Sequence, residues 1–96
     1  EIYQRNRMKT IRYSTKAKKD LKKYRNDVQL MKALYDILKK LANGDILPKE
    51  YKAHALIGNY KDCRECHIKN DFLLIWMDTE HDAIEVIRIG SHSELF

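Results

Sequence analysis

The sequence predicts an α+β fold, in which an N-terminal strand and a two-helix hairpin pack on a curved antiparallel sheet of three to four further strands. Two observations lead to this prediction. Apolar residues recur at helical spacing up to Asn43-Gly44, whereas after Pro48 they alternate with a period of two. The chain has 96 residues, enough for one compact core, so we expect the helices and the sheet to form a single domain over residues 8–96.

The N-terminal half is expected to form a strand followed by two helices. Apolar and polar side chains alternate in Lys9–Tyr13, as is typical of a short strand. Ser14 or Thr15 can cap the first helix, and Asn26 or Asp27 can cap the second. The apolar stripe of the first helix is Ala17, Leu21, Tyr24 and Val28, and that of the second is Leu30, Met31, Leu34, Ile37, Leu38 and Leu41. Asn43-Gly44 ends the second helix, because both residues tolerate the left-handed conformation.

The C-terminal half is expected to form an antiparallel meander. The predicted strands are Ala55–Ile57, Lys61–His67, Phe72–Met77 and Ala83–Ile89, with turns at Gly58-Asn59, Lys69-Asn70 and Asp78–Asp82. The run Leu73–Trp76 is apolar at every position, which indicates a central strand covered on both faces.

Composition and charge narrow the classes of function. Hydrophobic residues make up 44% and charged residues 34% of the chain, which is typical of a folded domain. No apolar run approaches the roughly 20 residues of a membrane span and no export signal is recognisable, so we expect a cytoplasmic protein without membrane contact. Residues 1–7 precede the first methionine, and we expect them to be a cloning remnant or a disordered leader.

The positive charge is concentrated in the N-terminal half. Residues 1–50 hold 14 Lys/Arg and 6 Asp/Glu, whereas residues 51–96 hold 5 and 8. The outer face of the first predicted helix carries Lys16, Lys18, Lys19, Lys22 and Lys23. This pattern suggests a polyanionic partner, either nucleic acid or an acidic protein, and a solvated helix face is an equally strong interpretation of the charge alone.

One motif suggests a cofactor that the predicted strands exclude. Cys63-Arg-Glu-Cys66-His67 matches the C-x-x-C-H signature of covalent haem attachment. Side chains alternate along a strand, so Cys63, Glu65 and His67 would share one face while Cys66 pointed to the other. The two thiols would diverge, and no second Cys or His pair lies at ligand spacing. We therefore expect no haem, no metal and no other cofactor.

A second set of residues suggests acid–base chemistry. Its members are His54, His67, Asp71, Arg88 and His92, with Phe72 and Phe96 beside them. In a meander His67 and Asp71 lie at the same sheet edge, whereas the position of Arg88 and His92 depends on strand order. Imidazoles and a carboxylate can move the protons of RNA cleavage, arginine can bind the phosphate, and aromatic rings can stack on bases. From spacing alone, ordinary surface histidines remain the competing interpretation.

The segments Tyr51–Gly58, Tyr60–His67 and Asp71–Trp76 resemble the YafQ branch of the RelE toxins, the ribonuclease halves of bacterial type II toxin–antitoxin pairs. Arg88–Phe96 matches the family ending R-x-G-[ST]-H-x-x-L-F. The resemblance covers residues 8–96. It implies a microbial ribonuclease fold, mRNA cleavage on the ribosome, and a cognate acidic antitoxin that wraps and neutralises the toxin. Operator DNA would be bound only through the antitoxin.

The resemblance also implies roles for individual residues. The family's catalytic or RNA-contacting positions fall on His54, His67, Asp71, Arg88, His92 and Phe96. Glu65 stands where aspartate is usual, and Phe72 where a larger aromatic can occur. Separately from the resemblance, the positive charge of the first helix leads us to expect that its lysines contact ribosomal RNA, with a solvated face as the alternative. The alternative is a non-catalytic RelE-fold partner for antitoxin binding and operator co-repression, but the intact set of histidines, Asp71 and Arg88 favours the nuclease. An electron carrier is the third and least favoured possibility.

Overall fold

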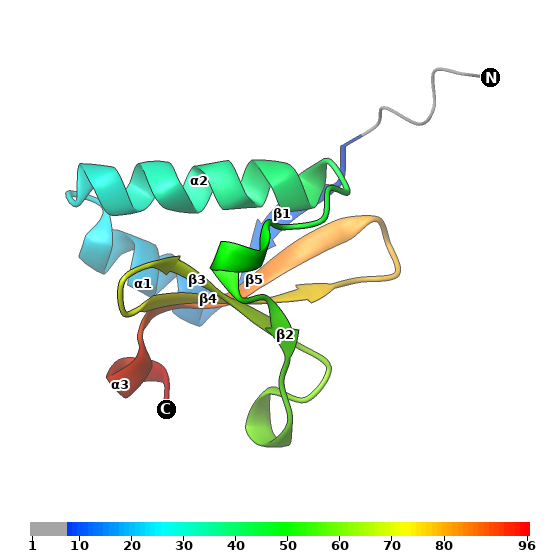
Figure 1. Cartoon of the computed structure of the whole chain (residues 1–96). Coiled ribbons are helices and arrows are strands. Elements are labelled where there is room, and N and C mark those ends of the chain that lie inside the picture. The colour runs from blue at the N-terminus through cyan, green and yellow to red at the C-terminus, as the bar shows by residue number, and fades with distance from the viewer. Residues whose placement is uncertain (1–7) are drawn as a thin grey trace.

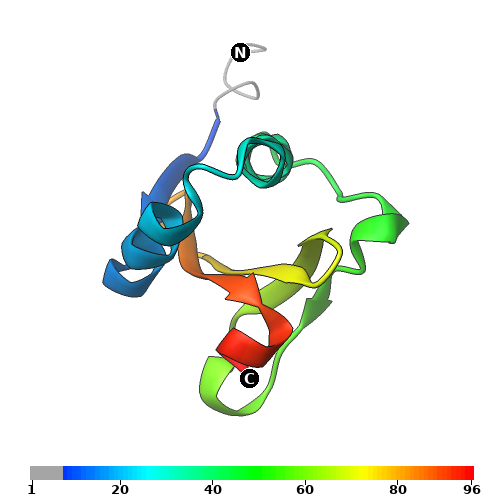
Figure 2. The same cartoon turned by 90° about the vertical axis from the view of Figure 1, so that its left-hand side faces the viewer.

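The computed structural model describes residues 8–96, and the expectation for residues 1–7 lies outside them. Five strands form one sheet in the order β1-β5-β4-β3-β2. Figure 1 shows α2 above this sheet, and Figure 2 shows α1 beside β1 and α3 on the side of the sheet opposite α2. The elements are β1 (Thr10–Tyr13), α1 (Thr15–Tyr24), α2 (Val28–Ala42), β2 (His54–Ala55), β3 (Arg64–Lys69), β4 (Phe72–Asp78), β5 (Ala83–Ser91) and α3 (His92–Leu95), with two 3-10 turns, η2 (Lys49–Tyr51) and η3 (Gly58–Tyr60).

The α+β prediction is confirmed, and β1 joins the sheet as its one parallel strand among the described residues. Thr10 pairs with Ala83 and Tyr13 with Val86, in parallel, whereas β2 to β5 form the predicted antiparallel meander. β4 lies in the middle of the sheet, as its continuous apolar run predicts. Leu74 and Trp76 pack under the helices, and Leu73 and Ile75 pack on the other face.

The helix boundaries follow from local capping. The Ser14 side chain accepts a hydrogen bond from the Ala17 N–H, and the Asp27 side chain accepts one from the Leu30 N–H, so these residues are the N-caps. Val28 was expected in the stripe of the first helix, and this is wrong: it is the first residue of α2 and 75% exposed. The first helix stops at Tyr24, so Val28 is out of phase with the stripe.

The strands around β2 are shorter than predicted. β2 contains only His54 and Ala55, and β3 begins at Arg64 instead of Lys61. The intervening chain curls into η3, and Asp62 adopts a left-handed conformation with φ 71°, which an extended strand cannot contain. β5 extends two residues beyond the prediction, to Ser91.

The two cysteines diverge as the strand alternation predicts. Cys66 packs in the core under the helices, whereas Cys63 packs with Leu73, Ile75 and Leu95 on the other face. Both are free thiols, and burial raises the pKa of Cys66 to about 12, which keeps it protonated. Within residues 8–96 no helix is long and apolar enough to cross a lipid bilayer.

Candidate active site

The sheet face opposite the two long helices carries most of the predicted site residues. Cross-strand pairs share a face, and Glu65, Ile75 and Arg88 form one row across β3, β4 and β5. His67 pairs with Leu73 on the same face, one step nearer to α3. The strand order therefore places Arg88 of β5 on the same sheet face as His67 of β3. The sequence alone did not decide this arrangement.

His54 is held by hydrogen bonds at both ring nitrogens. Its Nδ1 lies 2.9 Å from the carbonyl oxygen of Lys52, and its Nε2 lies 3.2 Å from Glu65 Oε1. Because a carbonyl oxygen only accepts, Nδ1 carries a proton, and the second bond needs another proton on the ring or on the carboxyl group. Glu65 is only 6% exposed, so His54 is the neighbour that compensates a buried carboxylate. These contacts fix the His54 ring against β3.

Arg88 is fixed from the side of α1. Its Nε donates to Asp20 Oδ2 at 2.8 Å and its Nη2 donates to Asp20 Oδ1 at 3.1 Å. The Asp20 carboxylate raises the pKa of Arg88, chiefly through these hydrogen bonds, and Tyr60 also lies close to the guanidinium. Arg88 is a permanently charged, partly exposed group on the candidate face.

The short helix α3 places His92 and Phe96 at the end of β5. Ser91 and Glu94 form a capping box, in which each side chain accepts from the other residue's backbone N–H. Gly90 permits this fold-back, because a Cβ there would lie 3.0 Å from Glu94 Oε1 and 3.2 Å from Leu95 Cδ2. The ring of His92 lies 5.2 Å from that of Phe96 between centroids.

Glu94 also ties α3 to the end of α1. Its carboxylate accepts hydrogen bonds from the Lys23 ammonium and the Tyr24 hydroxyl. These bonds and the Ser91 backbone N–H lower the pKa of Glu94 to about 2. Lys23 is therefore paired with a carboxylate, unlike the four exposed lysines Lys16, Lys18, Lys19 and Lys22.

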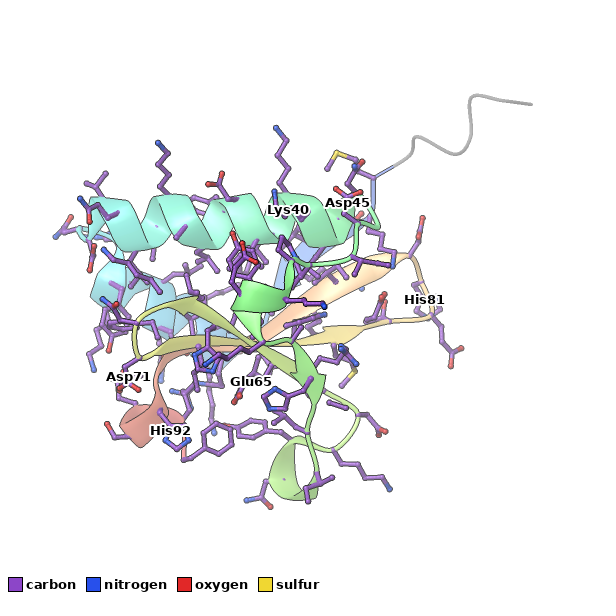
Figure 3. The ribbon with its side chains drawn as sticks, in the orientation of Figure 1. Lys40, Asp45, Glu65, Asp71, His81 and His92 are labelled. Atoms are coloured by element: carbon purple, nitrogen blue, oxygen red, sulfur yellow. The ribbon has the colours of Figure 1, made fainter. Side chains whose placement is uncertain are left out.

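Asp71 lies in the turn between β3 and β4, beside α3. Its carbonyl oxygen accepts a hydrogen bond from the His92 backbone N–H at 3.1 Å, and its side chain is exposed. Figure 3 shows Asp71 and His92 at the same end of the sheet, whereas His81 lies in the turn at the opposite end. Phe96 packs edge-on against Tyr60, with ring centroids 5.6 Å apart, on the same side.

The structure does not bring Phe72 to this face. Phe72 alternates with Leu73 along β4 and so points to the helix side, where its ring packs against Tyr24 with centroids 5.0 Å apart. The ring is only partly buried there. The contact of Phe72 with RNA therefore stays a prediction, from the helix side of the sheet and not from the face that carries Arg88.

Sequence reasoning missed two contributors and left a third without a role. Glu65 was placed on the strand face of His67, but its contact with His54 was not predicted. Asp20 had a weak signal: it is the only acidic residue in the lysine-rich α1, and it lies three residues after buried Ala17. Tyr60 had none, because η3 positions it only through the tertiary fold.

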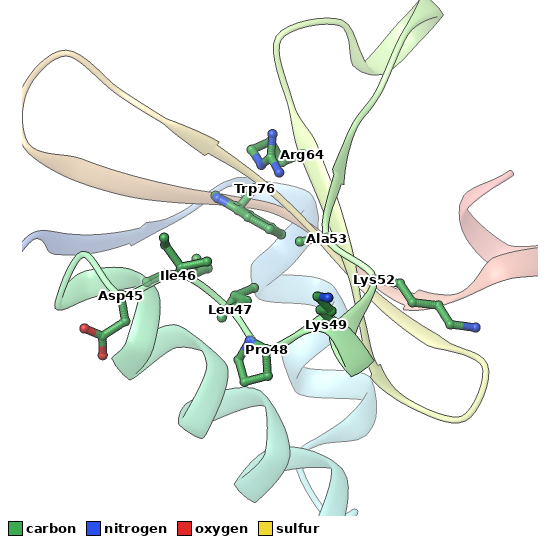
Figure 4. A pocket seen from close by; sticks show the side chains of 10 residues that line it. Asp45, Ile46, Leu47, Pro48, Lys49, Lys52, Ala53, Arg64 and Trp76 are labelled. Carbon is green, nitrogen blue, oxygen red and sulfur yellow. The ribbon is translucent and has the colours of Figure 1, made fainter.

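No enclosed cavity is needed for this site. Within residues 8–96 no group of three or more His, Cys, Asp or Glu side chains gathers that could hold a metal ion. The hollow of about 450 Å³ in Figure 4 lies elsewhere, where Trp76 stands between Arg64 and the loop residues Ile46 and Leu47. None of the predicted catalytic residues lines it. The candidate site is instead a surface site: His54, His67 and Arg88 are at least partly exposed, over a sheet face whose central residues Leu73 and Ile75 are buried.

Comparison with known proteins gives a consistent family. A family model described as the bacterial toxin of type II toxin-antitoxin system, YafQ, matches residues 9–96. The chain is 35% identical over 89 residues to the mRNA interferase toxin YafQ of Escherichia coli K12, covering 90% of this chain and 94% of the relative. It is similar in structure to a metal-bound toxin from Helicobacter pylori, with a TM-score of 0.83, 42% identity and coverage of 93% and 100%.

A second structural similarity is to YafQ in the E. coli DinJ–YafQ toxin–antitoxin complex, with a TM-score of 0.80 and 32% identity over 93% of this chain and 98% of that one. The family model and these relatives span the strands, the helices and the whole candidate face. The chain therefore belongs to the YafQ family of toxins of type II toxin–antitoxin systems.

Proposed function

We propose that this chain is an endoribonuclease toxin that cleaves mRNA by general acid–base catalysis. The observation that carries the proposal is the placement of Arg88, His54 and His67 on one sheet face, with His92 at its end. The E. coli relative is named an mRNA interferase toxin, which supports the same activity here.

In this proposal the RNA 2′-oxygen attacks the adjacent phosphorus. A base removes the 2′-OH proton, the O2′–P bond forms, the P–O5′ bond breaks and an acid protonates the departing 5′-oxygen. His92 is one proton-transfer group, and His67 or Asp71 is the other. Arg88 neutralises the charge that builds on the phosphate. Phe96 offers an exposed ring for base stacking, and the His54–Glu65 pair holds a proton beside the reacting groups.

We further propose that the outer face of α1 binds ribosomal RNA. Lys16, Lys18, Lys19 and Lys22 are exposed, whereas Lys23 also holds Glu94. Phosphate contacts of this kind supply affinity without sequence preference. In this proposal the substrate is mRNA held on the ribosome, and the chain acts in the cytoplasm.

We also propose a cognate acidic antitoxin as the protein partner. DinJ and YafQ form a complex in the E. coli structures, which supports an antitoxin here. An acidic segment that orders on binding complements the lysine-rich helix surface. Contact with operator DNA would be made only by the antitoxin.

Inducing the chain in bacteria, with and without the gene for its antitoxin, tests the proposal through growth and mapped mRNA ends. The wild-type chain should arrest growth and create new 5′ ends, and the antitoxin should suppress both. His92→Ala should lower the cleavage rate by about 10²–10⁴. His81→Ala is the matched control, because His81 lies in the distant β4–β5 turn. Absence of new ends with the wild-type chain would favour the non-catalytic partner instead.

A further inference from the structure

We propose that Asp20 is a positioning residue that fixes the Arg88 guanidinium in one orientation and leaves a defined edge of it free for the scissile phosphate. The inference rests on the proposed function, since it assigns the group that aims Arg88.

β1 covers only part of β5. The strand pairing ends at Tyr13 with Val86, and the Ser14 N–H then donates to the Val86 carbonyl oxygen. Beyond this point the outer edge of β5 needs other partners. α1 and its N-cap supply them from their side chains: Ser14 Oγ donates to the Ile87 carbonyl oxygen at 2.7 Å, and Asp20 Oδ2 accepts from the Ile89 N–H at 2.9 Å.

This anchoring makes Asp20 a rigid acceptor for Arg88. Its side chain is 12% exposed and receives three hydrogen bonds, one from the β5 backbone and two from the guanidinium. A carboxylate tied to the backbone of the next residue leaves the arginine little freedom. Asp20 therefore belongs to the site through Arg88, although it lies on a different element and contacts no substrate.

The geometry determines which donors remain for RNA. A guanidinium has five N–H donors in a fixed plane. Asp20 engages Nε and one hydrogen of Nη2 of Arg88, so that edge is occupied. The edge formed by Nη1 and the second hydrogen of Nη2 makes no hydrogen bond to Asp20, and Tyr60 lies close to the guanidinium. A phosphate can bind there with two parallel hydrogen bonds while the Asp20 pair stays intact.

Asp20→Asn tests the assignment, because it keeps the size of the side chain and removes its charge. Loss of orientation should lower the single-turnover cleavage rate about 10- to 100-fold, with little change in RNA affinity. In an Arg88→Ala background the same substitution should cost no further activity. Asp36→Asn, on the exposed side of α2, is the matched control. A purely structural role would reduce activity equally in both backgrounds and would overturn the inference.

NMR of the arginine side chains in the wild-type chain keeps the test independent of variant folding. A 2′-O-methyl oligonucleotide, which cannot be cleaved, should shift the Nη resonances of Arg88 and leave its Nε–H in place. A large shift of Nε–H with unchanged Nη would show that phosphate displaces Asp20, and would overturn the inference. If Arg88→Ala and His92→Ala both cleave at the wild-type rate, the proposed function fails as well. If they are inactive and Asp20→Asn is fully active, only this inference fails.

Discussion

Replacing Glu94 by glutamine should loosen α3 while leaving the sheet folded. Hydrogen bonds from Lys23, Tyr24 and the Ser91 backbone N–H lower the pKa of Glu94 from its ordinary value of 4.5 to about 2. A pKa change of this size corresponds to about 3 kcal/mol in the free energy of unfolding, for a carboxylate that is shielded from water. The side chains of Glu94 and Lys23 are 29% and 60% exposed, however. Screening by solvent therefore reduces the expected loss at Glu94 to about 1 kcal/mol.

The pH dependence of this loss has a definite sign. The folded-state pKa of Glu94 lies below the unfolded value, so the contribution is complete above about pH 4.5 and disappears as the pH falls towards 2. Wild type and Glu94→Gln should therefore differ at pH 7 and converge at about pH 2–3. The glutamine can still accept hydrogen bonds, so only the charge-dependent part is removed.

Amide hydrogen exchange in His92–Phe96 measures the effect directly. At pH 7 a loss of about 1 kcal/mol should accelerate exchange in α3 about fivefold, with β4 unchanged. The cleavage rate should fall in parallel, because α3 carries His92. Glu80→Gln, in the exposed β4–β5 turn, is the control and should change neither. Unchanged α3 protection at pH 7, or a difference that persists at the lowest pH, would refute the reasoning.

Two sets of substitutions and one chemical treatment test the site and the core further. Arg88→Lys should lose at least about 10-fold in cleavage rate, because one ammonium cannot donate in a plane to both Asp20 and phosphate; near-wild-type activity in a cleavage assay would contradict this. Reversing Lys18 and Lys22 to Glu should weaken ribosome binding and reduce its log–log salt slope by about 1 for each phosphate that is no longer bound, as measured by filter binding across salt concentrations. An unchanged slope would leave these lysines as a solvated helix face. Cys66 should resist a thiol reagent in the native chain and react only after unfolding, because burial raises its pKa to about 12; rapid labelling of the folded chain would argue against that burial.

Local chemistry made much of the fold predictable. The start of α2 at Asp27 and the formation of β4 depend on residues that are close together in the sequence. Sequence pattern and structure therefore agree at these two elements. Strand alternation predicted that Cys63 and Cys66 diverge, and the two thiols do pack in different apolar clusters. Val28 was misassigned because its spacing fits the stripe of α1, but α1 ends before reaching it.

The candidate site was less predictable, because it depends on contacts between distant segments. Alternation places Phe72 and His67 on opposite faces, but only the packing of the helices decides which face is covered. Asp20 acquires its partner from the insertion of β5 beside β1 and α1, which no local pattern encodes. Strand order was likewise needed to bring Arg88 to the side of His54.

The position of β5 between β1 and β4 has a consequence for how the chain acquires activity during synthesis. The pairing of Thr10 with Ala83 joins one of the earliest described segments to one of the latest, so β1 has no strand partner until β5 has been made. Contacts between such distant segments slow folding, and they form together with the partners of Arg88. A ribosome translating this chain therefore carries a nascent polypeptide whose proposed catalytic face is unassembled, and the nuclease becomes competent only after β5 and α3 have emerged.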